Sequence, residues 1–195
     1  MLRPHLLRIH EFFQRVVPRI RGCVFETLYG MPFRRIGRQF RLHGGRAISV
    51  GKYVSVGDGC WIEAVLSYRG YSYSPRLKIG DHVAISNWTH ISCAHEISLG
   101  DGCLLGSKIY IGDHNHGSVW SAKGRKIGFP AEMPLEDLER IEIGAGSWIC
   151  DGAVILPGTI LAPGSVVGAN SVVKLREERP ALIAGAPARV LRYLN

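Results

Sequence analysis

A six-residue spacing of aliphatic side chains limits the possible folds of this chain more than any other feature. From residue 143 onwards, an aliphatic side chain recurs at every sixth position, at Ile143, Ile149, Ile155, Leu161, Val167 and Val173. The same spacing occurs earlier in three shorter sets, which are Val50, Val56 and Ile62; Ile79, Ile85 and Ile91; and Leu99, Leu105 and Ile111. Neither a helix nor a simple amphipathic strand has this period. The pattern therefore predicts a repeat of short strands separated by corners.

The corners of this repeat carry turn-forming residues. Glycine follows the aliphatic residue at positions 51, 57, 80, 100, 106, 112, 144 and 168, and aspartate follows glycine at 58, 81, 101 and 113. Both residue types tolerate the backbone conformations of tight turns. Three such faces make one coil, and stacked coils bury a continuous apolar interior. We therefore predict an all-β solenoid, because a sandwich of short strands would not repeat its turns at constant spacing.

The net charge of +8 is concentrated in the N-terminal segment. Residues 1–41 carry nine Arg and two Glu, whereas the remaining 154 residues carry 15 basic and 14 acidic side chains. A nearly neutral body argues against a nucleic-acid partner. The five cysteines include no C-x-x-C pair, which argues against a disulfide framework and favours a cytoplasmic location.

The chain divides into three parts on these patterns. Residues 1–44 are expected to form a basic amphipathic helix, over 5–29, and a linker. Residues 45–178 are expected to form the β-solenoid, and residues 179–195 an extended segment with a short C-terminal helix over 188–194. No apolar stretch is long enough to span a membrane.

The predicted N-terminal helix has two possible roles. Its apolar side chains recur every three or four positions, at Leu6, Ile9, Phe13, Val16, Ile20, Val24 and Leu28. Such a helix could cap the open end of the solenoid, which otherwise exposes strand edges and apolar core. Because Arg8, Arg15 and Arg19 lie beside the stripe, it could instead hold the protein peripherally on an anionic inner-membrane surface.

A dense polar cluster precedes the longest break in the repeat. Residues 117–141 are predicted to form a protruding loop directly after Asp113-His114-Asn115-His116-Gly117, and loops of this length are more often functional than idle. The other repeats place Gly59, His82, Gly102 and Gly146 at the position of His114, so the fold does not require histidine there. An imidazole suits a general base, although an exposed corner residue is the alternative. Asp113 belongs to the recurring Gly-Asp corner, which favours a structural role.

These motifs resemble one family of enzymes. The Asp113–Gly117 cluster, the loop after it and the closing Ile183-Ala184-Gly185-Ala186-Pro187-Ala188-Arg189 segment resemble the hexapeptide-repeat sugar O-acetyltransferases, closest to those of bacterial O-antigen and capsule. The resemblance covers about residues 45–193 and implies a left-handed parallel β-helix, a homotrimer with sites between adjacent β-helices, and acetyl-CoA as cosubstrate. It also implies that His114 is the general base for direct attack of an acceptor hydroxyl on the thioester, without an acyl-enzyme.

The resemblance extends to further site residues. The galactoside acetyltransferases carry an acceptor-binding asparagine at the position matching Ser86, and here Asn87 is its neighbour. His116 could bind the acceptor or close the loop. The positions near coenzyme A in the family match Trp148, Ala169, Lys174, Arg189 and Arg192.

Four other functions share part of this pattern. An N-acetyltransferase of nucleotide-linked amino sugars, or a xenobiotic acetyltransferase, would carry most of the same motifs. Zinc-dependent β-helix proteins that hydrate carbon dioxide use a His-x4-His pair, whereas His114 and His116 are separated by one residue, so no metal is expected. A non-catalytic scaffold would not need a corner histidine beside a long loop.

Overall fold

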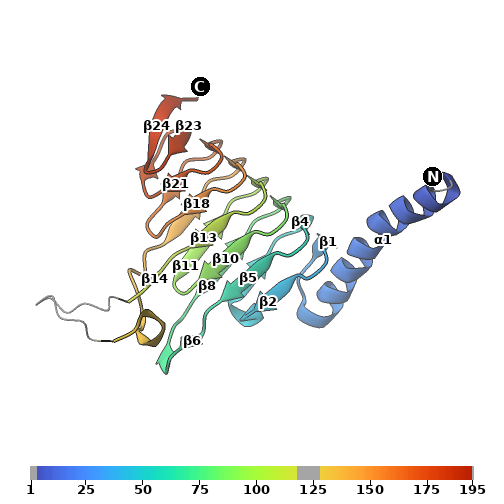
Figure 1. The fold of residues 1–195 in the computed structure, drawn as a ribbon, viewed down its shortest axis with the longest axis horizontal. Helices are drawn as coiled ribbons and strands as arrows, with labels where there is room; N and C mark the ends of the chain where they lie inside the picture. The colour runs from blue at the N-terminus through green and yellow to red at the C-terminus, as the bar shows by residue number, and fades with distance from the viewer. Residues whose placement is uncertain (1–3, 118–127, 195) are drawn as a thin grey trace, which may run out of the picture.

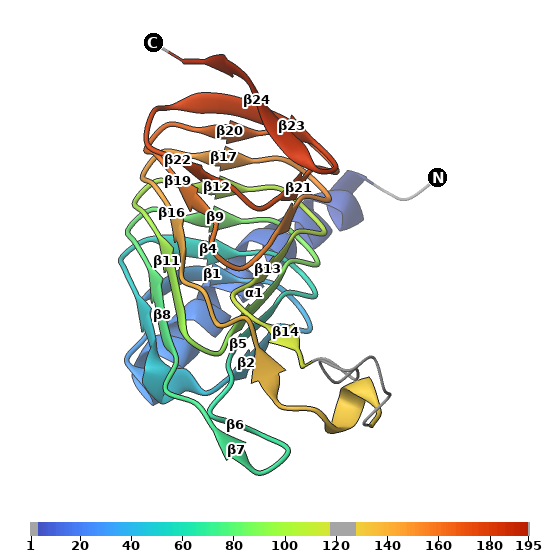
Figure 2. The same cartoon turned by 90° about the vertical axis from the view of Figure 1, so that its left-hand side faces the viewer.

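Three parallel β-sheets wind into a single solenoid. A computed structural model describes residues 4–117 and 128–194. The chain passes from sheet A to sheet B to sheet C and back in each coil, so that the sheets form the three faces of a prism (Figures 1 and 2). The predicted all-β solenoid of short strands is confirmed.

The strands of each face stack in chain order. Sheet A contains β1 (Phe33–Ile36), β4 (Val54–Val56), β9 (Ala84–Ile85), β12 (Leu104–Leu105), β17 (Trp148–Ile149), β20 (Val166–Val167), β23 (Ala181–Gly185) and β24 (Ala188–Tyr193). Sheet B contains β2 (Arg41–His43), β5 (Trp61–Ala64), β10 (His90–Cys93), β13 (Tyr110–Gly112), β18 (Val154–Ile155) and β21 (Val172–Val173). Sheet C contains β3 (Ile48–Val50), β8 (Arg76–Ile79), β11 (Glu96–Leu99), β16 (Ile141–Ile143), β19 (Ile160–Leu161) and β22 (Arg176–Glu177).

The six-residue aliphatic positions form the core. In sheet B, Ile62, Ile91, Ile111 and Ile155 are successive partners across the parallel strands, and all four are fully buried. Because alternate residues of a strand point to opposite faces, the neighbours of these isoleucines point outward. The solenoid therefore points its core side chains inward on each face and leaves the outward rows free for other roles.

The parallel ladders reach beyond residues 45–178 at both ends. At the N-terminal end, β1 pairs with β4 and β2 pairs with β5, so the first coil begins at residue 33. At the C-terminal end, β23 pairs with β20. The expected short C-terminal helix is wrong, because residues 188–193 form β24, an antiparallel partner of β23. The last coil leaves a strand edge exposed, and β24 satisfies the backbone groups of that edge.

Two excursions interrupt the coils, and both start from the end of a sheet B strand. The first is a hairpin of β6 (Ser67–Tyr68) and β7 (Tyr71–Ser72). The second excursion begins with β14 (Asn115–His116), which pairs with β15 (Leu135–Glu136). This excursion also contains a 3-10 turn over Pro130–Glu132. The predicted loop over 117–141 corresponds to this second excursion, but its residues 118–127 lie outside the described residues.

The helix α1 (Pro4–Tyr29) packs on the first coil through one face only. Gly22 is buried, and a Cβ at this position would collide with the Phe33 carbonyl oxygen. The Phe25 ring lies 5.5 Å from the Phe40 ring. The N-terminal end of α1 projects away from the solenoid (Figure 1). No helix in the described part of the chain combines the length and hydrophobicity needed to cross a bilayer.

Candidate active site

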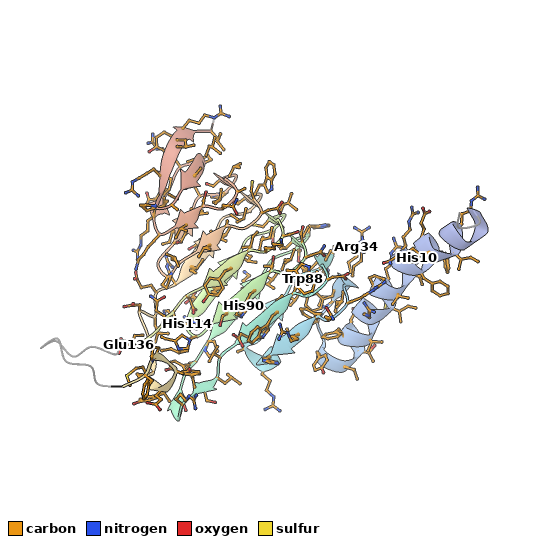
Figure 3. The ribbon with its side chains drawn as sticks, in the orientation of Figure 1. His10, Arg34, Trp88, His90, His114 and Glu136 are labelled. Carbon is orange, nitrogen blue, oxygen red and sulfur yellow. The ribbon has the colours of Figure 1, made fainter. Side chains whose placement is uncertain are left out.

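His114 lies where the chain leaves sheet B at the end of β13. It is 9% exposed, and its Nδ1 lies 2.8 Å from Oδ1 of Asp113. Since an ionised carboxylate only accepts hydrogen bonds, this contact places the proton of a neutral imidazole on Nδ1 and the lone pair on Nε2. The side chain is labelled between His90 and Glu136 in Figure 3. Nε2 is therefore the nitrogen that can accept a proton.

The backbone at His114 differs from that at the equivalent corners. The residues at the same place in the other repeats adopt left-handed conformations, with φ of 67° at Gly59, 57° at His82 and 68° at Gly102. His114 is not among the residues with positive φ, because the chain continues outward into β14 instead of turning into the next strand. This corner is thus built to present a side chain rather than to close a coil.

Asp113 anchors the imidazole from a fully buried position. Its Oδ1 and Oδ2 accept hydrogen bonds from the Ala94 and His95 amides, each at 2.8 Å, and the Cys93 thiol lies 3.3 Å from Oδ2. Burial alone would raise the pKa of this carboxyl, but hydrogen bonds from His114 and from the two amides outweigh burial and hold the pKa below its usual value. Asp113 therefore stays ionised and orients His114.

Sequence reasoning missed this role of Asp113 because of the repeat itself. The corner aspartates do accept amides from the preceding coil, as Asp81 does from Lys52 at 2.7 Å. Asp113 performs the same structural task for the coil before it. Its second task, which is to hold His114, also depends on how the chain leaves the coil, so the adjacent Asp-His pair gave only part of the signal.

The two excursions pack against each other beside His114. The Tyr68 hydroxyl donates to the Ala131 carbonyl at 3.1 Å, and the Tyr73 hydroxyl accepts from the Leu135 amide at 2.7 Å. The rings of Tyr68 and His116 lie 5.3 Å apart. His116 is exposed two residues from His114, so the structure brings it to the edge of the same site. The pairing of the two excursions could not be inferred from the repeat pattern.

Ser86 and Asn87 lie at a different corner from His114. They connect β9 of sheet A to β10 of sheet B, whereas His114 follows sheet B. The Asn87 side-chain oxygen accepts the Asp58 amide at 2.8 Å, which is the task that aspartate performs at other corners. Within one chain, the structure therefore does not bring these two residues to His114.

The residues matched to coenzyme A fall into two groups. Lys174 follows β21 at the same edge as His114, and its Nζ lies 3.2 Å from Glu139 Oε1. On sheet A, Trp148 pairs with Val166, Val166 with Leu182, and Leu182 with Arg192, so that Trp148 and Arg192 share one row. The remaining two residues also lie on or beside sheet A, with Arg189 in β24 and Ala169 in the turn after β20.

Histidines elsewhere on the solenoid are held by aromatic neighbours. The His82 ring stacks on Tyr53 at 4.9 Å, and the His90 ring stacks on Trp61 at 4.3 Å. Within residues 4–117 and 128–194, no three His, Cys, Asp or Glu side chains are grouped as a metal site.

The repeat and the three-faced coil have counterparts in known proteins. A family described as bacterial transferase hexapeptide (six repeats) matches residues 140–174. The "Putative lipopolysaccharide biosynthesis O-acetyl transferase WbbJ" of Escherichia coli K12 is 35% identical over 116 residues, which cover 59% of this chain and 59% of WbbJ. The match thus spans less than two thirds of that relative. Residues 140–174 thus match the hexapeptide-repeat transferase family, and a longer part of the chain is similar to a protein named as an O-acetyl transferase.

Solved structures share the fold at low sequence identity. AntD, an N-acyltransferase from Bacillus cereus, has a TM-score of 0.63 at 16% identity over 85% of this chain and 86% of that chain. A hexapeptide-repeat acetyltransferase from Vibrio cholerae has a TM-score of 0.52 at 24% identity over 95% of this chain and 85% of that chain. These similarities show that the architecture is shared.

Proposed function

We propose that this protein is an acetyl-CoA-dependent O-acetyltransferase that acts on a bacterial surface saccharide or its precursor. The observation that carries this proposal is the buried Asp113–His114 pair at the corner where the chain enters the second excursion. The name of WbbJ supports a saccharide acceptor. AntD is described in complex with an amino-sugar nucleotide and coenzyme A, and a Vibrio cholerae protein of similar fold with acetyl coenzyme A.

The geometry of His114 supports direct transfer. Nε2 of His114 removes the proton of the acceptor hydroxyl while the hydroxyl oxygen forms a bond to the thioester carbonyl carbon. The carbon–sulfur bond then breaks, and the imidazolium returns its proton to the departing coenzyme A thiolate. Asp113 stabilises the imidazolium through Nδ1 during this step, and no acyl-enzyme forms.

The two groups of coenzyme A residues support an assembled site. Lys174 shares the edge of His114, whereas Trp148, Ala169, Arg189 and Arg192 lie on the side of sheet A. In a homotrimer of left-handed β-helices, the edge of one subunit can face sheet A of the next, which brings both groups to one groove. Arginine suits the phosphates of coenzyme A because its guanidinium pairs with them bidentately.

The acceptor atom can be tested directly. The purified protein is incubated with isotopically labelled acetyl-CoA and oligosaccharides from bacterial O-polysaccharides, and the products are analysed by mass spectrometry. Label that is removed by mild alkali identifies an ester and supports O-acetylation. Label that survives alkali identifies an amide and favours the N-acetyltransferase alternative. Absence of any transfer by folded protein rejects the proposed activity.

Removing the two C-terminal arginines is expected to weaken acetyl-CoA binding. Each arginine–phosphate contact is worth about 1.5 kcal/mol or more, so the Arg189→Ala/Arg192→Ala variant should bind at least about 100-fold more weakly. Calorimetric titration of acetyl-CoA measures the change. Arg76→Ala, an exposed arginine of sheet C, serves as the matched control and should bind like the parent. Equal affinities in all three proteins would remove Arg189 and Arg192 from the site.

The exposed face of α1 supports peripheral membrane contact in the cytoplasm. The helix packs on the solenoid through Gly22, which leaves the apolar stripe turned away from the body, with Ile9 52%, Phe13 55% and Ile20 56% exposed. Arg8, Arg15 and Arg19 lie along one side of the stripe, as on helices that rest on anionic lipid. We therefore propose that the stripe inserts into the surface of an anionic bilayer.

Vesicle co-sedimentation is expected to depend on both the stripe and the lipid charge. The parent should sediment with phosphatidylglycerol vesicles and much less with phosphatidylcholine vesicles. The Ile9→Ser/Phe13→Ser/Ile20→Ser variant should stay in the supernatant, because it loses about 5 kcal/mol of apolar burial. Leu66→Ser, an exposed leucine at the base of the β6–β7 hairpin and far along the chain from α1, is the control. Sedimentation of the triple variant at the level of the parent would contradict the proposal.

A further inference from the structure

The outer face of sheet B carries side chains that the proposed reaction does not use. By strand register, Arg41, Trp61, His90 and Tyr110 are successive partners, and so are His43, Glu63, Ser92 and Gly112. These two adjacent rows cross β2, β5, β10 and β13 and end two residues before His114. We call their side chains the sheet B patch, consisting of Arg41, His43, Trp61, Glu63, His90, Ser92 and Tyr110.

Glu63 is the centre of the patch. Its Oε1 accepts a hydrogen bond from Ser92 Oγ at 2.8 Å and lies 3.2 Å from His90 Nε2. Burial opposes ionisation, but these two contacts hold the pKa of the Glu63 carboxyl below its usual value. Among the described residues, the nearest partner of Oε2 is His43 Nδ1, at 3.9 Å. One oxygen thus fixes the carboxylate in place while the other keeps its capacity to accept hydrogen bonds.

Aromatic rings flank this carboxylate. The Trp61 ring lies between two neighbours. The Arg41 guanidinium is 4.7 Å from the Trp61 ring, and the His90 ring is stacked parallel to it. Nε1 of Trp61 is buried and has no acceptor within the described part of the chain. The Tyr110 ring lies 5.5 Å from His90, and its hydroxyl lies over Gly112, where any Cβ would collide with it. Glycine at 112 therefore leaves room for a phenol that points along the face toward the His114 corner.

The fold itself does not require these residue types. Farther along sheet B, the position that follows Tyr110 in register is occupied by Val154 and then by Val172. The outward positions of sheet C carry exposed charged residues such as Arg76, Lys78 and Glu142. Trp61, His90 and Tyr110 thus form a run of rings on the part of sheet B that leads to His114.

The charge of the patch indicates what it can bind. Glu63 and the nearby Asp113 are anionic, and Arg41 at the far end is the one permanent cation of the patch. A diphosphate would be repelled by the Glu63 carboxylate, whereas sugar hydroxyls can donate to that carboxylate and accept from imidazole and phenol groups. Aromatic rings add flat apolar surface with a polar tip. Neutral saccharide therefore fits this surface better than a nucleotide does.

The length of the patch indicates how much saccharide it can bind. Adjacent strands lie about 4.8 Å apart, so β5 is about 10 Å from β13. A single sugar ring held with its hydroxyl at His114 cannot also reach Glu63 and Trp61 on β5. We propose that the sheet B patch binds the sugar units that precede the acetylated one, so that the acceptor is an oligosaccharide or longer chain rather than a single sugar. The placement of the acetylated sugar unit at His114 rests on the proposed function.

The test measures saccharide binding apart from catalysis. The probes are oligosaccharides released by mild acid from bacterial O-polysaccharides and the monosaccharides obtained by complete hydrolysis of the same material. Binding to the parent, Glu63→Gln and Tyr110→Phe is measured by saturation-transfer NMR without acetyl-CoA, and oligomeric state by light scattering. Glu96→Gln is the matched control, because Glu96 lies on the outer face of sheet C in the same coil as His90.

The patch predicts a difference between the two classes of probe. The dissociation constant of the oligosaccharide should rise about tenfold in Glu63→Gln and about threefold in Tyr110→Phe, and stay unchanged in Glu96→Gln. Monosaccharide affinity should be the same in all four proteins. Equal oligosaccharide affinity in the parent and Glu63→Gln, no oligosaccharide binding by the parent, or a changed oligomeric state in Glu63→Gln would each overturn the inference.

The two proposals fail in different ways. Oligosaccharide binding that Glu63→Gln weakens, without any acetyl transfer by the parent, would support the patch and reject the proposed function. Acetyl transfer to oligosaccharides at the same KM in the parent and Glu63→Gln would support the function and reject the patch.

Discussion

Replacing His114 with glutamine is expected to lower the rate of acetyl transfer by about 100- to 10,000-fold, which is the usual contribution of a general base. Glutamine has no lone pair basic enough to take a proton from a hydroxyl, so the loss should appear in kcat. Acetyl-CoA affinity should change little, because the cations proposed to bind its phosphates lie on other elements. The measurement is steady-state release of coenzyme A with a fixed saccharide acceptor.

A nearby histidine provides the control for this experiment. His95 lies one coil away at the same edge of the solenoid. Its backbone amide donates a hydrogen bond to Asp113, but its side chain is exposed. His95→Gln keeps that amide and should transfer acetyl groups at the parental rate. An equal and large loss in both variants would indicate a general disturbance of the corner. Parental activity in His114→Gln would rule out His114 as the base.

The solenoid could be predicted because its repeat is local and strict. The positions of Ile143, Ile149 and Ile155 alone fix one inward side chain per face, and the structure buries all three. Glycine and aspartate at the corners supply the turns and the amide acceptors. Because each coil contacts only its neighbours, a six-residue pattern contains nearly all the information that the fold needs.

The ends of the solenoid could not be predicted in this way. The segment after Pro187 has arginines three residues apart, which suits a helix, yet it forms β24. The exposed edge of β23 decided the outcome, and an edge is a property of the assembled sheet rather than of the segment. Likewise, β1 and β2 join the first coil without a strict aliphatic repeat, because β4 and β5 offer them unpaired strand edges.

The site was predictable only where a residue departs from its repeat. His114 stands out because glycine is common at the equivalent corners. Asp113 does not stand out, since aspartate is common there, and its hydrogen bond to His114 depends on how the chain leaves the coil. The rows of the sheet B patch come from four different coils, and only the register of the assembled sheet places them side by side.

Replacing Asp113 with asparagine is expected to reduce both activity and stability. The two carboxylate oxygens accept from four donors, which are the Ala94 and His95 amides, His114 Nδ1 and the Cys93 thiol. Asparagine offers one oxygen and one NH2 group, so either orientation turns a donor toward a buried donor. An unsatisfied buried amide costs about 1–3 kcal/mol, and loss of the His114 contact should lower kcat about 100-fold or more.

A second corner aspartate provides the matched control. Asp81 accepts the Lys52 amide through Oδ1, and Asn87 already performs the same task for the Asp58 amide. Asp81→Asn should therefore fold and transfer acetyl groups like the parent. Denaturant unfolding gives the free energy of unfolding of each protein, and coenzyme A release gives kcat. Equal results for Asp113→Asn and Asp81→Asn would reduce Asp113 to an ordinary corner residue.

The pH dependence of stability separates the charge of Asp113 from its shape. Hydrogen bonds hold the pKa of Asp113 below its usual value, so the ionised carboxylate stabilises the folded protein above about pH 4. This stabilisation is lost as the pH falls through the lowered pKa and the carboxylate takes up a proton. Asparagine takes up none, so the difference in unfolding free energy between the parent and Asp113→Asn should narrow below about pH 4. A difference that stays constant down to pH values near 2 would show that Asp113 acts through packing and not through its charge.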